Sequence, residues 1–157
     1  MTRVCLLGND GTDLRAELMA YETARNALAQ YAIDEPFANA IAVETISLGA
    51  AVSLLNDLNW YLVRLVDDAL VLEPSIAPDE WLSRELATAI RNEAVDPAET
   101  GTMLKVFGVK DADAEGARPI LTEPMFLRRV DGSIPSYDLA DVDDTLIVRV
   151  TTEEFQG

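Results

Sequence analysis

The sequence predicts an α/β (α+β) protein, with a helix-rich α/β lobe over residues 1–96 and a β-rich lobe over residues 101–157. Two patterns indicate this class. In the first half, apolar residues recur at spacings of three and four, which is typical of amphipathic helices. After Gly101 the chain runs through segments rich in Val, Ile and Leu between turn residues, which is typical of strands. Because 157 residues is close to the size of one domain, we expect a single domain, with a ferredoxin-like arrangement as one hypothesis for the first lobe.

The chain begins with a predicted strand over residues 3–7, which ends at the turn residues 8–11. Thr12 is a good N-cap, because its hydroxyl can accept hydrogen bonds from the free amides of a first helical turn. The apolar spacing then predicts one amphipathic helix running to about Tyr31, broken by the segment 34–36. A second strand follows over residues 41–45.

Ser47 is positioned to cap another helix, whose buried side would carry Leu48, Val52 and Leu55. Residues 60–72 fit two structures. Their Val, Tyr and Trp content favours a strand or a hairpin turning at residues 67–68, which we prefer, while the leucine spacing also fits a helix. Residues 78–80 then predict a helix start, since proline suits the first helical position and carboxylates complement the helix dipole.

That helix is expected to carry Trp81 and Leu82 on its apolar face and to end at residues 96–97. In the second lobe we expect strands over residues 104–109, 120–130 and 145–151. A hairpin turn is predicted at residues 131–132, with a short strand over 133–137 after it. Residues 111–116 form a small, acidic connection and are predicted to be a mobile loop.

Charge is the most informative property of the whole chain. The formal net charge is −16, from 28 acidic and 12 basic residues, and the chain has no histidine. Like charges repel within a compact domain, and molar salt shortens the Debye length to about 3 Å. The composition therefore predicts a protein adapted to a salt-loaded cytoplasm; the alternative is an acidic protein of an ordinary cell.

The sequence predicts a soluble, unexported, cytoplasmic protein with no membrane segment, because the apolar run after Arg3 is too short to span a bilayer. The single cysteine, Cys5, cannot form an internal disulfide and is expected to be a buried, inert thiol. The lack of histidine excludes Ser-His and Cys-His catalysis and imidazole metal sites. We predict no cofactor and no metal site.

Four segments carry a resemblance to a known family: residues 3–15 (RVCLLGNDGTDLR), 44–51 (ETISLGAA), 54–64 (LLNDLNWYLVR) and 96–101 (DPAETG). Together they are similar to an uncharacterised haloarchaeal protein family, a domain of unknown function. The resemblance spans most of the chain and implies a halophilic archaeal cytosol, which agrees with the charge argument. It implies no activity and assigns no catalytic residue.

The loop between the first strand and the first helix is the first candidate ligand site. Free amides at a helix N-terminus attract anions, and glycines let a phosphate approach the backbone. The loop lacks the lysine-containing phosphate-loop pattern, however, and a plain turn with a helix cap explains it too. Asp10 with Asp13 could hold Mg²⁺ there. The candidate ligand-binding residues of this loop are Gly8, Asn9, Asp10, Gly11 and Thr12.

Arg128 and Arg129 are the second candidate, since they add to the cations of the second lobe in an otherwise acidic chain. On a strand they point to opposite faces, so only one of them can join a single patch. They could bind an anionic ligand or an acidic partner, or pair with neighbouring acids. General binding of nucleic acid is disfavoured, because the chain has no broad basic face.

Three functions follow as hypotheses. The first is a non-catalytic cytosolic binding or regulatory module of a halophilic archaeon, acting through protein contacts or a small anionic ligand. The second is a small α/β enzyme that acts on a phosphorylated or nucleotide substrate with Mg²⁺. The third is a subunit of a larger assembly, which an exposed apolar patch around Trp60 or Trp81 would support. The catalytic residues, the partner and the oligomeric state stay open.

Overall fold

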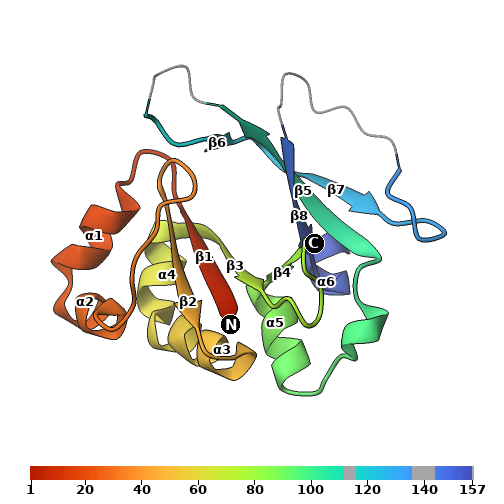
Figure 1. The fold of residues 1–157 in the computed structure, drawn as a ribbon, viewed down its shortest axis with the longest axis horizontal. Coiled ribbons are helices and arrows are strands. Elements are labelled where there is room, and N and C mark those ends of the chain that lie inside the picture. Colours follow the sequence, from red (N-terminus) through yellow and green to blue (C-terminus); the bar gives the residue numbers. More distant parts are fainter. Residues whose placement is uncertain (112–115, 136–143, 157) are drawn as a thin grey trace.

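The computed structural model describes residues 1–111, 116–135 and 144–156. In these residues the chain forms a mixed α/β fold with six α-helices and an eight-stranded sheet that curls into a half-barrel (Figure 1). The strand order is β2-β1-β3-β4-β8-β5-β6, and β7 also pairs with β5. The predicted strand over 133–137 and the predicted loop over 111–116 lie partly outside the described residues.

The first strand, β1 (Thr2–Gly8), pairs antiparallel with both β2 (Ala40–Thr45) and β3 (Val66–Leu72). The sequence prediction of the first two strands is confirmed. Alternate residues of β1 face opposite sides of the sheet, and both sides are buried. The strand therefore reads as a continuous apolar run, as expected for a strand covered on both faces.

The single helix predicted to run to Tyr31 is wrong. The structure has α1 (Leu14–Ala20) and α2 (Glu22–Leu28), separated by Tyr21 in an extended conformation with φ −99° and ψ 124°. The Tyr21 ring packs against Tyr61, with ring centroids 5.2 Å apart, so a tertiary contact accompanies the break. The predicted cap is also wrong, because the Asp13 carboxylate rather than Thr12 accepts the hydrogen bond from the Ala16 amide.

The next helix, α3 (Leu48–Asp57), begins as predicted at Ser47, whose hydroxyl accepts from the Ala50 amide at 3.0 Å. The preferred strand over residues 60–72 is wrong in its first half. Residues Asn59–Leu65 form helix α4, and β3 starts only at Val66. No turn occurs at residues 67–68, because both lie inside β3. The helix indicated by the leucine spacing therefore forms in the first half of the segment, and the preferred strand forms in the second half.

The helix predicted to start at residues 78–80 begins later. Strand β4 (Trp81–Ser83) comes first and pairs with β3, with Leu82 opposite Val71. Helix α5 (Arg84–Arg91) follows, capped by the Ser83 hydroxyl, which accepts from the Leu86 amide. Sheet pairing thus overrides the local helix signal of the proline and its acidic neighbours. A short 3₁₀ helix, η1 (Pro97–Glu99), leads into the second half.

The second half contains the predicted strands with changed bounds. They are β5 (Met103–Lys110), β6 (Ile120–Leu121), β7 (Met125–Arg128) and β8 (Asp144–Arg149), followed by α6 (Thr152–Gln156). The single strand predicted over 120–130 is wrong, because the chain leaves the sheet between β6 and β7. There Thr122 ties back to Gly108: its hydroxyl accepts from the Gly108 amide at 3.0 Å, and its own amide donates to the Gly108 carbonyl at 2.9 Å.

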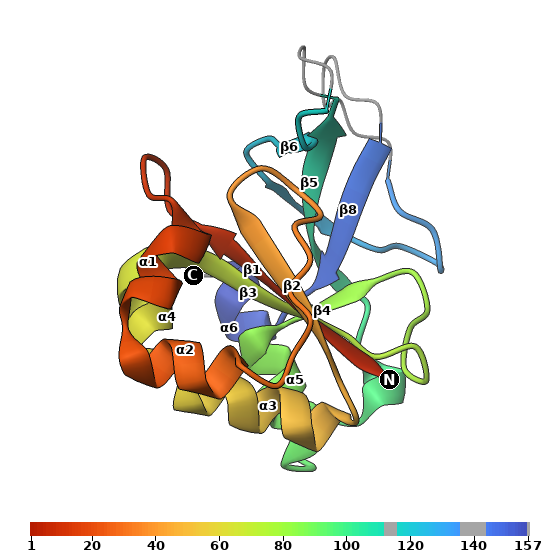
Figure 2. The ribbon, with the colours of Figure 1, turned by 60° about the vertical axis from the view of Figure 1, so that its left-hand side comes forward.

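The structure does not show a division into two lobes. The parallel pairing of β4 with β8 makes one continuous sheet through both halves. A ferredoxin-like arrangement is not shown either. Its split βαβ unit places another strand between two helix-linked strands, whereas β1 and β2 are direct antiparallel neighbours. Figure 2 shows the helices α1 to α5 on one side of β1, β2 and β3, with β5 and β8 rising from the other.

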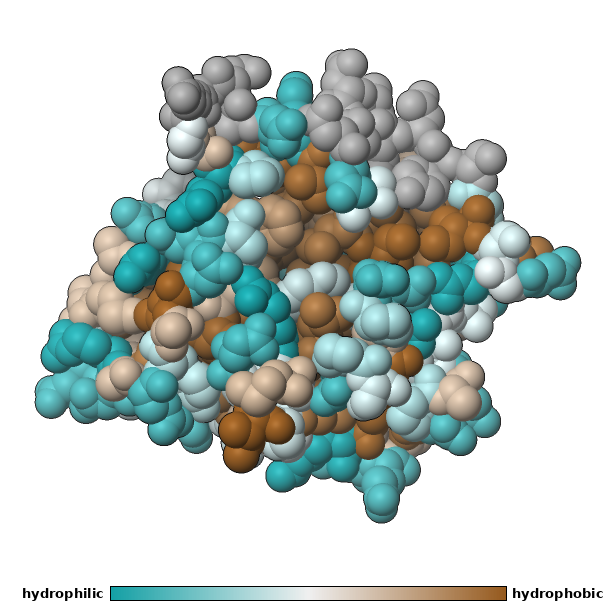
Figure 3. Space-filling model, viewed as in Figure 1, coloured by the Kyte–Doolittle hydropathy of each residue, from teal (hydrophilic) through white to brown (hydrophobic). Residues whose placement is uncertain are grey.

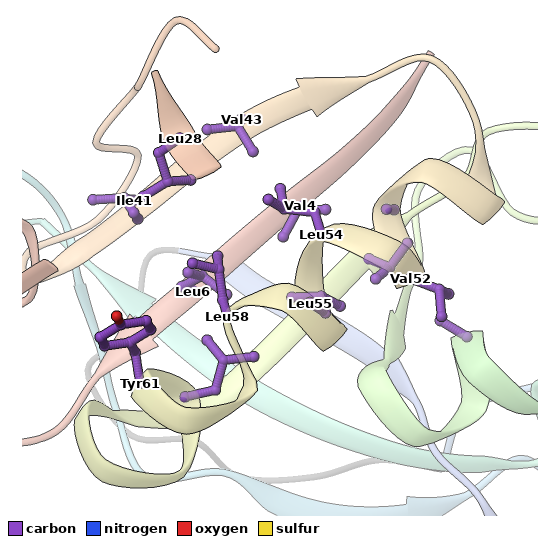
Figure 4. Close-up of a cluster of buried hydrophobic side chains, with 14 of the residues drawn as sticks. Val4, Leu6, Leu28, Ile41, Val43, Val52, Leu54, Leu55, Leu58 and Tyr61 are labelled. Carbon is purple, nitrogen blue, oxygen red and sulfur yellow. The ribbon is translucent and has the colours of Figure 1, made fainter. Parts of the chain in front are cut away.

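Two hydrophobic clusters explain why the sheet is one unit. In the first, Val4 and Leu6 of β1 and Ile41 and Val43 of β2 pack against the helices, including Leu55 of α3 (Figure 4). The second cluster lies on the opposite face of β1. Its members come from both halves of the chain: Cys5, Leu7, Ala40, Ala42, Leu70, Phe107, Val148 and Val150. The two halves therefore share a core. Within the described residues, every helix is too short or too polar to cross a bilayer.

Candidate functional site

An open cavity of about 980 Å³ lies between two arms of the half-barrel, one formed by β1 and β2 and the other by β5 and β6. One wall comes from the end of β1, the loop after it and the start of β2; the other comes from β5, β6 and the residues after β6. The Ala38 amide donates to the Pro119 carbonyl at 2.8 Å and so joins the two walls at one point. The cavity is thus built from segments far apart in the sequence.

The loop predicted from the sequence lies at this cavity. Gly8, Asp10, Gly11 and Thr12 line it. Asn9 does not line it; its side chain donates to the Arg64 carbonyl at 2.8 Å and anchors the loop to the end of α4. Gly11 has φ +78° and open space around it, so it serves the turn itself.

Asn39 organises the loop, and sequence reasoning missed it. Its side-chain oxygen accepts from the Leu14 amide at 2.8 Å, and its Nδ2 donates to the Asn9 carbonyl at 2.9 Å. A Cβ on Gly8 would lie 2.7 Å from Asn39 Nδ2, so Gly8 lacks a side chain because Asn39 needs that space. Asn39 has φ 56°, a conformation that asparagine tolerates better than most residues, which was its one signal in the sequence.

The amides around the start of α1 are engaged within the chain. Leu14 donates to Asn39, Ala16 donates to the Asp13 carboxylate at 3.2 Å, and Thr12 donates to the Asn9 carbonyl at 3.2 Å. With seven residues, α1 is also short. The arrangement is that of a capped turn.

In the cavity lining, a lysine and an aspartate from two strands that are not neighbours in the sheet form an ion pair. Lys105 Nζ of β5 lies 3.0 Å and 2.9 Å from the two carboxylate oxygens of Asp68 of β3. The ammonium also lies 5.4 Å from the centroid of the Phe107 ring, within range of a cation–π interaction. No pattern in the sequence predicts this pair, since 37 positions separate its members.

Arg128 and Arg129 do not line the cavity. Arg128 is the last residue of β7, is exposed and lies over the Phe155 ring at 5.5 Å, while Arg129 follows the strand and is half-buried. Arg129 and Arg149 both bind the carboxylate of Glu80, the latter at 2.7 Å. Arg129 thus pairs with a neighbouring acid.

The environment of this cluster lowers the pKa of Glu80. Burial by itself would raise that pKa, but the hydrogen bonds and positive charges of Arg129 and Arg149 outweigh it and hold the carboxylate ionised. The chain passes close by at Gly101, which has φ +100° and where a Cβ would lie 3.0 Å from the Arg149 guanidinium carbon. The cluster is packed tightly against backbone.

The cysteine and the two aspartates of the loop were also considered as chemically active groups. Cys5 is 1% exposed, and burial raises the pKa of its thiol to about 12. One oxygen of Asp13 caps α1, while Asp10 is exposed at the cavity mouth. Across the described ranges, no group of three or more acidic or cysteine side chains is arranged to hold a metal ion.

A separate surface carries exposed aromatic and aliphatic side chains. Trp60 is 50% exposed and Val63 is 71% exposed, both on α4, and Tyr21 lies beside Trp60 with ring centroids 5.8 Å apart. The Arg64 guanidinium stacks on the Trp60 ring at 3.7 Å. Figure 3 shows further hydrophobic surface gathered in a band beneath the grey atoms. Trp81, the other tryptophan considered, is partly buried against the second core cluster.

Comparisons with known proteins place the chain in one family. Neither the curated proteins nor the solved structures give a match. A family model described as a family of unknown function, DUF5804, matches residues 2–109. These residues run from β1 into β5 and include Gly8, Asn39, Asp68 and Lys105, so they contain one wall of the cavity and the lysine–aspartate pair. The chain therefore belongs to DUF5804, a family of unknown function.

Proposed function

We propose that this protein is a non-catalytic binding module of a halophilic archaeal cytosol and that it takes its ligand in the open cavity of the half-barrel. The observation that carries the proposal is the cavity itself. Its volume of about 980 Å³ is at the upper end of the range for small-molecule sites, about 300–1,000 Å³. The loop that sequence analysis singled out forms part of its wall.

A blocking variant tests this proposal. Ala38 is exposed and lines the cavity, so Ala38→Trp places an indole at the entrance without removing a side-chain contact. Ala98→Trp is the matched control, because Ala98 is exposed on η1 and does not line the cavity. The immobilised proteins are incubated in molar KCl with a small-molecule extract of the source cells, and bound compounds are identified by mass spectrometry.

We expect the wild type and Ala98→Trp to retain the same compound and Ala38→Trp to lose it. Retention of the same compounds by all three proteins would show that the cavity is not the site. No specific compound on any of them would also count against the proposal.

The salt-loaded cytoplasm is the second part of the proposal. It is supported by the net charge of −16, which molar salt screens to short range. Urea unfolding in rising concentrations of KCl tests it, and we expect the fold to loosen below roughly molar salt. A domain that is equally stable in dilute buffer would contradict this part and leave the cavity proposal standing.

A subunit of a larger assembly is a second candidate function, and the surface around Trp60 is the observation that favours it. Trp, Tyr and Arg are enriched where protein interfaces are most tightly packed, and Trp60, Tyr21 and Arg64 lie together here. Val63→Asp should abolish capture of a stoichiometric partner in molar KCl. The control Val130→Asp changes an equally apolar, 54% exposed residue outside this surface.

A further inference from the structure

Within the cavity proposed above as the binding site, the charges do not balance. The acidic side chains that line it are Asp10, Asp13, Glu35, Asp67, Asp68 and Glu123, and the basic ones are Arg15 and Lys105. Both bases are already ion-paired: Arg15 lies 3.1 Å from Glu35, and Lys105 lies 2.9 Å from Asp68. The remaining four carboxylates form no ion pair with a described residue.

Several of the donors that an anion would use are taken. The two bases are paired, and the amides of Leu14 and Ala16 donate to Asn39 and Asp13. An anionic ligand would have to approach four unpaired carboxylates. A cationic ligand meets free acceptors instead, and low-dielectric walls strengthen the field of charges gathered in a concave site.

Part of the cavity lining is apolar. Leu7 is 8% exposed, Phe107 is 5% exposed, and Ala40 is 3% exposed; all three belong to the second core cluster and also line the cavity. Ile120, on the opposite wall, leaves 48% of its surface exposed. A ligand that fits this lining has an apolar body as well as a charge.

From these three observations we infer that the cavity takes a cationic ligand with an apolar body, such as an alkylammonium or alkylguanidinium compound. This inference rests on the proposed function, because it names the chemistry of the same site. Of the four unpaired carboxylates, all exposed, Asp10 and Glu123 represent the two opposite walls of the cavity. The apolar body distinguishes such a ligand from K⁺, which molar KCl supplies in excess.

Three probes with one apolar body and different charge test the inference: hexylammonium, hexanoate and hexanol. Each is titrated into ¹⁵N-labelled protein in molar KCl, and amide shifts at Gly11, Phe107 and Ile120 report the cavity. We expect saturable shifts with hexylammonium, about two- to fivefold weaker binding of hexanol, and no binding of hexanoate. The upper end of that range corresponds to about 1 kcal/mol, the most that one exposed charge contact usually provides.

Charge-removing variants then locate the cation. Asp10→Asn and Glu123→Gln should each weaken hexylammonium binding about two- to fivefold and leave hexanol binding unchanged. Glu99→Gln is the matched control, because Glu99 is exposed on η1 and does not line the cavity. A uniform effect of all three variants would show that net charge, rather than this site, attracts the probe, and would overturn the inference.

The inference and the proposed function fail in different ways. If hexanoate or hexanol binds the cavity more tightly than hexylammonium, the cavity is a binding site and the inference about charge is wrong. If Ala38→Trp retains every compound that the wild type retains, the proposed function itself fails. If none of the three probes shifts the cavity amides, the inferred ligand class is wrong, and the extract experiment still decides the function.

Discussion

Lys105 and Asp68 join two strands that do not touch in the sheet. The lysine ammonium bonds to both carboxylate oxygens of the aspartate, at 3.0 and 2.9 Å, although β4 and β8 lie between their strands in the sheet order. Only 19% and 24% of the two side chains is exposed, so solvent screens the pair less than a surface ion pair. The contact holds the two arms of the half-barrel together on its concave side.

A double-mutant cycle with Lys105→Met and Asp68→Asn measures this contact. We expect a coupling free energy of about 1–2 kcal/mol from urea unfolding, since a two-contact, partly buried pair exceeds the 0.2–1 kcal/mol that is usual for exposed pairs. The control cycle uses Arg15→Met and Glu35→Gln, whose side chains are 49% and 40% exposed, and should give less than about 0.5 kcal/mol. Equal coupling in the two cycles would mean that Lys105 and Asp68 do not tie the arms together.

Arg129 and its neighbour Arg128 should differ sharply in their effect on stability. Arg129→Met removes one of two guanidinium groups on Glu80 and should cost about 1–3 kcal/mol of unfolding free energy. Arg128→Met removes an exposed cation and should change it by less than about 0.5 kcal/mol. Urea unfolding of both variants measures the difference. Similar losses of unfolding free energy in the two would show that the contact between Arg129 and Glu80 does not stabilise the fold.

Stability should fall in acid partly through Glu80. Its pKa is lower in the folded protein than the ordinary glutamate value of 4.5, so the unfolded chain binds the proton more tightly. The ionised carboxylate therefore stabilises the fold fully above pH 4.5, and this contribution is lost as the pH falls through the folded pKa. Glu80→Gln should be less stable at neutral pH and lose less on acidification. An unchanged slope of unfolding free energy against pH in this window would contradict the assignment.

Loss of Asp13, which caps α1 in the structure, should destabilise the protein more than loss of Thr12, the cap expected from the sequence. Asp13→Ala removes the acceptor of the Ala16 amide and should cost about 1 kcal/mol. Thr12→Ala should cost less than about 0.5 kcal/mol, because its side chain does not cap α1. Thermal unfolding of the two variants decides between the two residues; a larger loss with Thr12→Ala would restore the sequence expectation.

Elements with strong local signals were predicted well. The apolar run of β1 and the serine before α3 specify a strand and a helix start by short-range chemistry alone, and both are confirmed. Errors occurred where tertiary contacts override the local signal. Trp81–Ser83 joins the sheet beside β3 although the preceding proline and acids favour a helix, and Tyr21 is extended where the apolar spacing favours continuation.

The residues of the candidate site also fall into those that the sequence predicted and those that it did not. The loop from Gly8 to Thr12 was identified because glycines and an aspartate between a strand and a helix form a turn in any context. Asn39 offered only the tolerance of asparagine for a positive φ, and the other wall of the cavity offered no local signal. Their roles depend on which distant backbone groups lie beside them, and that is set by the pairing of β1 with β2 and of β5 with β8.

Composition and periodicity alone established the mixed α/β class, the charge of −16 and the position of the turn after β1, because each depends on neighbours in the chain or on a sum over it. Long-range packing determined the continuity of the sheet through β4 and β8, the shared second core, and the pairing of Lys105 with Asp68. These features join residues 37 or more positions apart, and their energy comes from burial and ion pairing that exist only once the sheet has curled.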